Sequence, residues 1–589
     1  MNQYTPSRWN LKDLFPSHES QVMMDAFNTL QSEVEDIEAY REKLSPDTNI
    51  QEFMAILQKQ EELTRLASRM GQFAELQFYE DTQNQEAQAF QAKMQQFMAE
   101  IQNRLLFFNL WWKGLSDEEA APFIEAAKKH NFNNFLRQIR KFKPFTLQEA
   151  EEKIINIKNV TGVHALRRLY AIITNRYAFN VEVDGEIKKL NRGQLMSLVQ
   201  TADSDLRARA YQELYRVYGD DGPILGQIYQ ALVRDFANEN IDMRGYTTPI
   251  SWRNLNNDIP DEVVHKLLDV AQKNVSVFQR YFKLKAKMLN IKKLKRYDIY
   301  APVIELTKEY EYDYAVNLVL NTFNKFNQKI AALARRVFDD NHIDSQIRPT
   351  KATGAFCSSS DPILTPYVLI NYNGKASDIE MLAHELGHAI HAMIADKHNV
   401  FDFHSSLPLA ETASTFSEML LVDQLLKEEA DINVKRDILF HQVAEAYATI
   451  MRQIYFALFE REAHAMIMKD ASTDDLNNLY MKNLETQFGD SVELSTEFQW
   501  EWVSVPHIYD TPFYVYAYAF GQLLVLALYK QFKTEGDSFI PRYLEILRAG
   551  GSAPPIEILD RAGVNIRVPV FWQGGFDVIS EMIDKLENI

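Results

Sequence analysis

The chain is poor in cysteine, glycine and proline. Its 589 residues include one cysteine, Cys357, with 20 glycines and 19 prolines. A single cysteine excludes a disulfide within the chain, so we expect a reducing compartment, the cytoplasm. Because helix-breaking residues are scarce while Phe (36) and Tyr (27) are plentiful, the composition favours long packed helices over a β-sandwich or a disordered array.

A long apolar run and a positive net charge are also absent. The stretch LLVLALY at 523–529 is far shorter than the roughly 20 apolar residues that cross a bilayer. The opening MNQYTPSRWNLKDLF lacks the basic and then apolar segments of a secretory signal. A net charge of −18 repels phosphate backbones. We therefore expect a protein that binds neither nucleic acid nor membranes.

Apolar residues three and four positions apart recur along most of the chain, which is typical of amphipathic helices. This periodicity predicts helices over 49–78, 80–113, 203–240, 261–290, 312–338, 376–395, 411–429, 434–468 and 512–533. The second helix carries an apolar stripe formed by Met94, Phe97, Met98 and Ile101. We expect that stripe to pack in the core rather than to bind a cofactor.

Two regions break the helical pattern. FNVEVDGEIKKL at 179–190 alternates apolar and polar residues around an Asp-Gly pair, which predicts a tight β-hairpin. We take it as the seam between an N-terminal helical lobe, 1–200, and a second domain, 201–589, that contains the motifs described below. The segments 353–359 and 366–374 predict two short strands. These strands either offer an edge to an extended peptide or only support the following helix, and both interpretations remain open.

The segment MLAHELGHAIHAM, residues 381–393, carries two histidines four positions apart. Ser377 lies three residues before Glu380, the spacing of a capping box, and helical periodicity follows. His384 and His388 should therefore lie one turn apart on the same face of a helix. Two imidazoles so arranged can hold one metal ion at about 2.0–2.1 Å, the zinc–nitrogen distance.

Glu385 is one step around the same helix, beside the expected ion rather than on it. From there it can accept a proton from a water molecule activated by the metal. A surface helix with spare histidines is the alternative. It explains the surroundings less well, because Leu386, Ala389 and Met393 make the segment apolar and buried imidazoles need partners.

A catalytic zinc takes three protein ligands and leaves one position for water. The segment LPLAETASTFSEMLL at 407–421 predicts a helix with Glu411 and Glu418 two turns apart on one face. Glu411 is the expected third ligand, and Glu418 would accept a hydrogen bond from the distal nitrogen of a ligand histidine. His404 competes for the third position, and His391 is expected to have a structural or supporting role.

The segment SVPHIYDTPFYVYAYAFGQ at 504–522 crowds His507 and several tyrosines at the start of a predicted helix. Imidazole and phenol donors aimed at a developing oxyanion would assist peptide hydrolysis at a metal ion. An aromatic core stripe is the alternative, since Phe513, Tyr516 and Phe520 are at helical spacing. The spacing alone leaves both interpretations open.

The motifs HELGHAIH, ETASTFSE and PHIYDTPFYVYAYAFG, in this order, resemble the thimet-oligopeptidase-like metallopeptidases. The match is best to their oligoendopeptidase F branch, whose N-terminus the opening WNLKDLF also resembles. The resemblance is dense from about 350 to 525 and diffuse elsewhere. It implies a mainly α, zincin-like fold, a two-lobed helical ellipsoid with a deep central channel and a small β element next to the zinc helix.

Carried over position by position, the resemblance makes His384, His388 and Glu411 the ligands of one zinc ion per chain. It makes Glu385 the general base and acid. Glu418 matches the glutamate that orients a ligand histidine in the family.

The resemblance also assigns His507 and Tyr516 to transition-state stabilisation. The family's other active tyrosine falls at Phe513 or, with a shift of one residue, at Tyr514. That departure leaves the second phenol open, with Tyr514 as the candidate. Leu386 stands where some relatives have phenylalanine, a change that should matter little.

Together with the metal motif, the resemblance implies a zinc-dependent endopeptidase that hydrolyses short unstructured peptides. A dipeptidyl carboxypeptidase of the same family is one alternative, and it would need a basic group for the terminal carboxylate of its substrate. Arg244 in DMRGYTTP is a candidate for substrate contact, although stabilising a turn is its simpler role. The other alternative is a non-catalytic helical peptide-binding protein with a structural or vestigial metal site.

Overall fold

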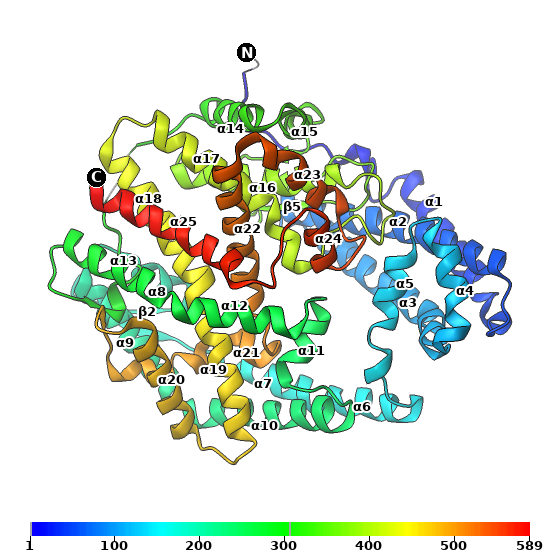
Figure 1. Cartoon of the computed structure of the whole chain (residues 1–589), viewed down its shortest axis with the longest axis horizontal. Coiled ribbons are helices and arrows are strands. Elements are labelled where there is room, and N and C mark those ends of the chain that lie inside the picture. Colours follow the sequence, from blue (N-terminus) through cyan, green and yellow to red (C-terminus); the bar gives the residue numbers. More distant parts are fainter. Residues whose placement is uncertain (1–2, 305–307) are drawn as a thin grey trace. The chain divides into compact units, whose positions relative to one another are not determined.

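Helices make up most of the chain, as the scarcity of glycine and proline predicts. The computed structural model describes residues 3–304 and 308–589 (Figure 1). The described residues form two compact units, each assembled from segments far apart in the sequence. Unit 1 comprises residues 1–144, 308–428 and 532–564, and unit 2 comprises 145–307, 429–531 and 565–589. The division expected at residue 200 falls inside unit 2 and remains a prediction from the motifs.

Unit 1 combines N-terminal helices with a central block and a short C-terminal pair. Its α-helices are α1 (Gln21–Glu38), α2 (Ile50–Glu80), α3 (Gln85–Gly114), α4 (Asp117–Lys128), α5 (Asn133–Arg140), α14 (Tyr312–Phe326), α15 (Gln328–Asp339), α16 (Ala376–Ile394), α17 (Ser414–Glu428), α23 (Ile540–Ala549) and α24 (Pro555–Arg561). Its strands are β4 (Ile343–Asp344), β5 (Phe356–Ser358) and β6 (Tyr367–Leu369).

Unit 2 is also mainly helical. Its α-helices are α6 (Glu149–Thr161), α7 (Val163–Asn175), α8 (Arg192–Leu198), α9 (Ser204–Asp220), α10 (Gly222–Phe236), α11 (Pro249–Asn256), α12 (Asp261–Lys273), α13 (Val275–Met288), α18 (Ile432–Ala446), α19 (Arg452–Ile467), α20 (Thr473–Phe488), α21 (Pro506–Asp510), α22 (Tyr516–Glu535, which ends in unit 1) and α25 (Pro569–Asn588). Its strands are β1 (Phe179–Val183), β2 (Glu186–Leu190), β3 (Leu294–Lys295) and β7 (Val492–Glu493). Across the described residues, none of the helices is long and apolar enough to span a membrane.

The two long helices predicted first, 49–78 and 80–113, are confirmed as α2 and α3. The Asn84 side chain accepts the N–H groups of Glu86 and Ala87 and so starts α3 with a side-chain cap. Met94 and Ile101 are buried in the apolar core of unit 1, and the other two members of the predicted stripe pack against it. The prediction that this stripe is core packing is confirmed.

Three predicted helices are each divided into two, at Asp221, Asn274 and Asn327. Asn327 shows the reason, because its side chain accepts the N–H groups of Lys329 and Ile330 and caps a new helix. Short polar side chains compete with the helical hydrogen bonds and favour such ends. Apolar periodicity runs through these positions, so it predicts one helix where the backbone forms two.

The predicted β elements are present. Strands β1 and β2 pair antiparallel, joined by Asp184 and Gly185, whose φ angles are 56° and 79°. Strand β5 pairs antiparallel with β6 in a sheet of order β4-β6-β5. Both β5 and β6 contact α16, which confirms a small β element next to that helix. Within the described chain, the outer edge of β5 has no partner strand.

Candidate active site

Helix α16 carries the two histidines of the central motif. It begins at Ala376, where the Asp378 carboxylate accepts the N–H groups of Lys375 at 3.0 Å and Asn373 at 2.8 Å. The capping box predicted at Ser377 and Glu380 is therefore wrong by two residues, because Asp378 is the closer acceptor.

His384 and His388 lie one turn apart on α16, as predicted, with ring centroids 5.0 Å apart. Gly387, between them, lets the next segment approach α16 closely. A Cβ at Gly387 would lie 2.5 Å from Ser414 Cα and 2.6 Å from the Ala413 carbonyl oxygen. Only glycine permits that contact without displacing the backbone.

The segment that packs there contributes two carboxylates. Glu411 belongs to a 3₁₀ helix, Leu407–Thr412, and Glu418 to α17. The single helix predicted over 411–429 is thus interrupted before Ser414. Helices α16 and α17 pack against each other in unit 1 (Figure 1). Their packing brings both carboxylates to the histidines.

The three predicted metal ligands converge. Glu411 Oε2 lies 3.3 Å from His384 Nε2 and 3.4 Å from His388 Nε2. One ligand atom from each residue lies within 4.8 Å of the others. Ligands at about 2.0–2.1 Å in a tetrahedral zinc site are separated by about 3.3–3.4 Å. The donor set therefore fits one zinc ion and leaves a fourth position for another ligand.

Two further contacts orient these ligands. His384 Nδ1 lies 3.1 Å from Glu418 Oε2, so with Nε2 facing Glu411 the Nδ1–H donates to Glu418. Ser414 Oγ donates to Glu411 Oε2 at 2.5 Å. A carboxylate behind a ligand histidine fixes its tautomer and raises its basicity. The structure thus has Glu418 beside the distal nitrogen of His384, the contact expected from the sequence.

The electrostatics of the cluster favour bound positive charge. Burial opposes a charge on His384, but hydrogen bonds to Glu411 and Glu418 outweigh it and raise its pKa to about 10. Burial would raise the pKa of Glu411, yet the hydrogen bond from His384 and the charge of the histidines lower it to about 2. A proton or a cation is thus strongly held between these groups.

Glu385 lies beside this cluster with 5% of its surface exposed. Burial raises its pKa to about 7, against the opposing effect of His384. Its Oε2 is buried and has no hydrogen-bond partner among the described residues. A carboxylate with a pKa near neutrality and an unused oxygen is suited to accept a proton from a reacting water.

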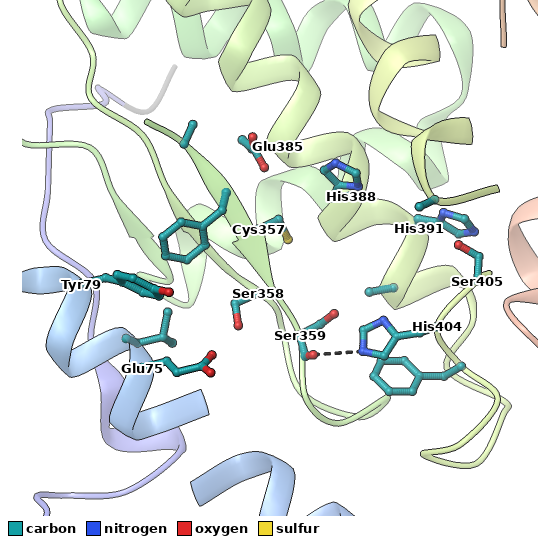
Figure 2. Close-up of a pocket in the computed structure, with 16 residues that line it drawn as sticks. Glu75, Tyr79, Cys357, Ser358, Ser359, Glu385, His388, His391, His404 and Ser405 are labelled. Carbon is teal, nitrogen blue, oxygen red and sulfur yellow. Dashed lines mark hydrogen bonds between the residues drawn. The ribbon is translucent and has the colours of Figure 1, made fainter. Parts of the chain in front are cut away.

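A cavity of about 630 Å³, called here the metal pocket, opens in front of Glu385 and His388 (Figure 2). Residues of β5, including Cys357, line one side of it. His391 and His404 also line the pocket but are not part of the ligand cluster. His404 was the alternative candidate for the third metal ligand. Its Nε2 instead lies 3.1 Å from the Ser359 carbonyl oxygen, within hydrogen-bonding distance.

The segment with His507 belongs to unit 2. His507 is exposed on α21, and its ring is parallel to that of Tyr514, with centroids 6.0 Å apart. Tyr518, which is 40% exposed, contacts both rings, with centroids 6.2 Å from His507 and 5.3 Å from Tyr514. Sequence reasoning did not select Tyr518 because one tyrosine among several carries no distinguishing local signal.

Tyr516 differs from these three. It is fully buried, and its hydroxyl donates to Asn254 Oδ1 at 2.6 Å and accepts from Asn257 Nδ2 at 2.9 Å. Such a satisfied hydroxyl is a core anchor of unit 2 in this structure. Arg244 is likewise engaged, by Glu152 and Glu239, as expected for a structural arginine.

Comparison with known proteins agrees with the motifs. The family model described as Peptidase family M3 matches residues 197–577, and the model described as Oligopeptidase F matches residues 111–179. Oligopeptidase PepF of Bacillus subtilis is 25% identical over 99% of this chain and 87% of its own length. Group B oligopeptidase PepB of Streptococcus agalactiae is 27% identical over 92% of this chain and 90% of its own.

Solved structures share the fold. A structure from Chlamydophila abortus has a TM-score of 0.88 at 23% identity and covers 99% of this chain and 98% of its own. Oligoendopeptidase-F from Enterococcus faecium has a TM-score of 0.71 at 23% identity, covering 96% and 98%. The resemblance found in the motifs is confirmed. With a family model matching more than half of its residues, the chain belongs to peptidase family M3 and is a peptidase.

Proposed function

We propose that the protein is a zinc-dependent endopeptidase that hydrolyses short, unstructured peptides. The observation that carries this proposal is the convergence of His384, His388 and Glu411 with an unpaired carboxylate, Glu385, beside them. Relatives named oligopeptidase and oligoendopeptidase support the same substrate class. The single cysteine adds support for a cytoplasmic location.

His384, His388 and Glu411 would hold the zinc ion. When bound there, the ion would polarise a peptide carbonyl and lower the pKa of a coordinated water. Glu385 accepts the proton of the attacking water and passes it to the nitrogen of the departing peptide. Glu418 keeps His384 in the tautomer whose Nε2 is free to bind.

His507 and a tyrosine of the same segment would stabilise the oxyanion. The resemblance names Tyr516 and Tyr514. Tyr514 is favoured because its side chain is partly exposed in unit 2, whereas that of Tyr516 is buried. The Tyr518 hydroxyl is hydrogen-bonded to Tyr514 and would orient it. A donor to a developing oxyanion must have a free N–H or O–H. Because two asparagines engage its hydroxyl, Tyr516 would support the position of this segment rather than contact the oxyanion itself.

The substrate would bind as an extended strand. The outer edge of β5 lines the metal pocket, and its free backbone groups can pair with a peptide. Edge pairing recognises the peptide backbone and so tolerates many sequences. It also requires an unfolded substrate, because a folded chain already uses these groups.

The two alternatives are less well supported. A dipeptidyl carboxypeptidase needs a basic group for the terminal carboxylate, and no Lys or Arg lines the metal pocket among the residues described. A non-catalytic binding protein would not need Glu385 beside the ligands, buried and with a pKa near neutrality.

Digestion of defined peptides tests the proposal. Fragment masses should show internal cleavage of peptides, none of a folded protein, and full loss of cleavage with a chelator. Removal of C-terminal dipeptides alone would replace the endopeptidase assignment by the carboxypeptidase. Binding without cleavage, in protein that contains zinc, would favour the non-catalytic alternative.

A further inference from the structure

A second cavity, of about 790 Å³, adjoins the metal pocket in unit 1. Helices α2 and α3 supply most of its lining, and we call it the α2–α3 groove. The two cavities share the lining residues Glu75, Ser358, Ser359, Phe403 and His404. A peptide that lies in the metal pocket along β5 can therefore extend into the groove.

The side of α2 that faces the groove is largely polar or small. Its residues recur three or four positions apart and include Gln60, Thr64, Ser68, Gly71, Gln72 and Glu75. A helix that only packed against α3 would present apolar side chains at such positions. A Cβ added at Gly71 would meet no atom within 4 Å, so the groove is open at that point.

Several of these side chains have unused hydrogen-bonding capacity. The side chains of Gln60, Thr64 and Ser68 have no hydrogen-bond partner within the described part of the chain. Gln72 differs, because it is held by Ser358 and Ser360. Amide and hydroxyl groups both donate and accept, so the free ones match the N–H and C=O groups of a peptide backbone.

The opposite wall, on α3, is mainly apolar, with the amides Gln102 and Asn109 among its lining residues. Met98, Ile101 and Leu105 of α3 line the groove together with Phe403. Such a wall accommodates aliphatic groups, including the stems of lysine and arginine side chains.

Glu75 is the one Asp, Glu, Lys or Arg that lines the groove among the described residues. No ion-pair partner of Glu75 occurs in that part of the chain, and neither cavity is lined by Lys or Arg. Figure 2 shows its carboxylate directed from α2 toward Ser358 and Ser359. The residue keeps solvent-exposed surface, and the partial burial of its carboxyl group raises its pKa.

We propose that the α2–α3 groove binds the substrate beyond the metal pocket, and that Glu75 there pairs with a positively charged group of the peptide. The inference rests on the proposed peptidase function and assigns it a preference for cationic peptides. The charge has two possible sources, the side chain of lysine or arginine and the free α-ammonium group. Both present N–H donors to a carboxylate.

The test uses quenched peptides of one length and one scissile bond. In one series, a single lysine is placed at successive positions along the peptide. In a matched series, norleucine replaces that lysine. Every peptide is made with a free and with an acetylated N-terminus. Wild type is compared with Glu75→Gln, Glu75→Lys and a control, Glu62→Gln. Glu62 is exposed on α2 and lines neither cavity, so the control removes the same charge from the same helix.

We expect Glu75→Gln to lower kcat/KM for cationic peptides about fivefold more than for neutral ones, mainly through KM. Glu75→Lys should reverse the preference, and Glu62→Gln should change neither value. If norleucine abolishes the effect, the charge is a side chain; if acetylation does, it is the α-ammonium group. Equal effects on cationic and neutral peptides would overturn the inference.

Binding provides a readout that does not depend on turnover. In a Glu385→Gln background, Glu75→Gln should weaken the affinity for the cationic peptide about fivefold more than that for the neutral one. Cleavage of the neutral peptide by wild type tests the proposed function separately. If the enzyme cleaves both peptides and substitution of Glu75 changes neither rate, the proposed role of the groove is refuted, whereas the proposed peptidase function stands.

Discussion

In unit 2, a carboxyl oxygen of Glu460 accepts a hydrogen bond at 2.9 Å from the backbone N–H of Phe513. Phe513 has a φ of 56°, in the left-handed region that residues other than glycine rarely adopt. The carbonyl of the same peptide group, on Pro512, accepts from Arg253 Nε at 3.3 Å. Side chains from two other helices thus hold both ends of one peptide group. The turn that they fix leads directly into Tyr514, beside His507.

Replacing Glu460 should therefore affect both stability and turnover. Glu460→Ala leaves a buried N–H unpaired, which costs about 1–3 kcal/mol of unfolding free energy. If the His507 segment acts in catalysis, kcat should also fall with KM little changed. Glu460→Gln should restore much of both, because its amide oxygen still accepts.

A control separates the two effects. Asp298 forms a buried ion pair with Arg207 at 2.7 Å elsewhere in unit 2. Asp298→Asn should lower the unfolding temperature without a comparable change in kcat. Equal loss of kcat in both variants at equal stability would show that Glu460 acts only through folding.

Glu460 also predicts a pH dependence of stability. Burial raises its pKa to about 8 in the folded chain, against the opposing effects of the Phe513 N–H and Arg253. Between about pH 4.5 and 8 the unfolded chain releases this proton while the folded chain keeps it. The free energy of unfolding should therefore fall as pH rises through this window, by up to about 1.4 kcal/mol per pH unit. Denaturant unfolding of Glu460→Gln should lack this component; an identical pH slope in both proteins would contradict it.

Gly387 should be indispensable for the approach of α17 to α16. Gly387→Ala places a Cβ 2.5 Å from Ser414 Cα, and relieving that overlap should cost about 1–3 kcal/mol and weaken metal binding. Gly114→Ala is the matched control, because a Cβ there meets no atom within 4 Å. Calorimetry and a zinc titration of both variants test this. Wild-type affinity and stability in Gly387→Ala would refute the packing argument.

Glu418 should act on the metal through His384. Glu418→Ala removes the acceptor of the Nδ1–H and should weaken zinc binding about 10- to 100-fold, with the helices intact. Glu418→Gln keeps an acceptor oxygen and should lose less. Competition with a chromophoric chelator measures both affinities. The interpretation fails if the alanine variant binds zinc as tightly as wild type.

Local sequence patterns were sufficient to predict much of the secondary structure and most residues of the candidate metal site. The interval of four between His384 and His388 fixes their shared face on any helix, and the hairpin follows from Asp184-Gly185. Glu411 followed from its place in a motif. Helix ends were predicted less well, because Asn327 and Asp378 decide them through side-chain caps that apolar periodicity does not record.

Long-range relationships were not predictable in the same way. Glu460 and Phe513 are 53 residues apart, and neither has a local signal for their contact. The polar face of α2 is visible in the sequence, but only the packing of α3 and the loop with His404 turns it into a groove. The two units draw on segments from the whole length of the chain, which local periodicity cannot reveal.

The most direct test of the proposed chemistry is to measure bound zinc and peptide turnover together in purified wild type and Glu385→Gln. We predict about one zinc ion per chain in both proteins, because Glu385 is not a ligand, and a loss of turnover of about 10²–10⁴-fold in the variant. Zinc-replete Glu385→Gln that cleaves peptides at the wild-type rate would contradict the assignment of the base. Fully active wild type without any bound divalent metal would contradict the metal centre itself.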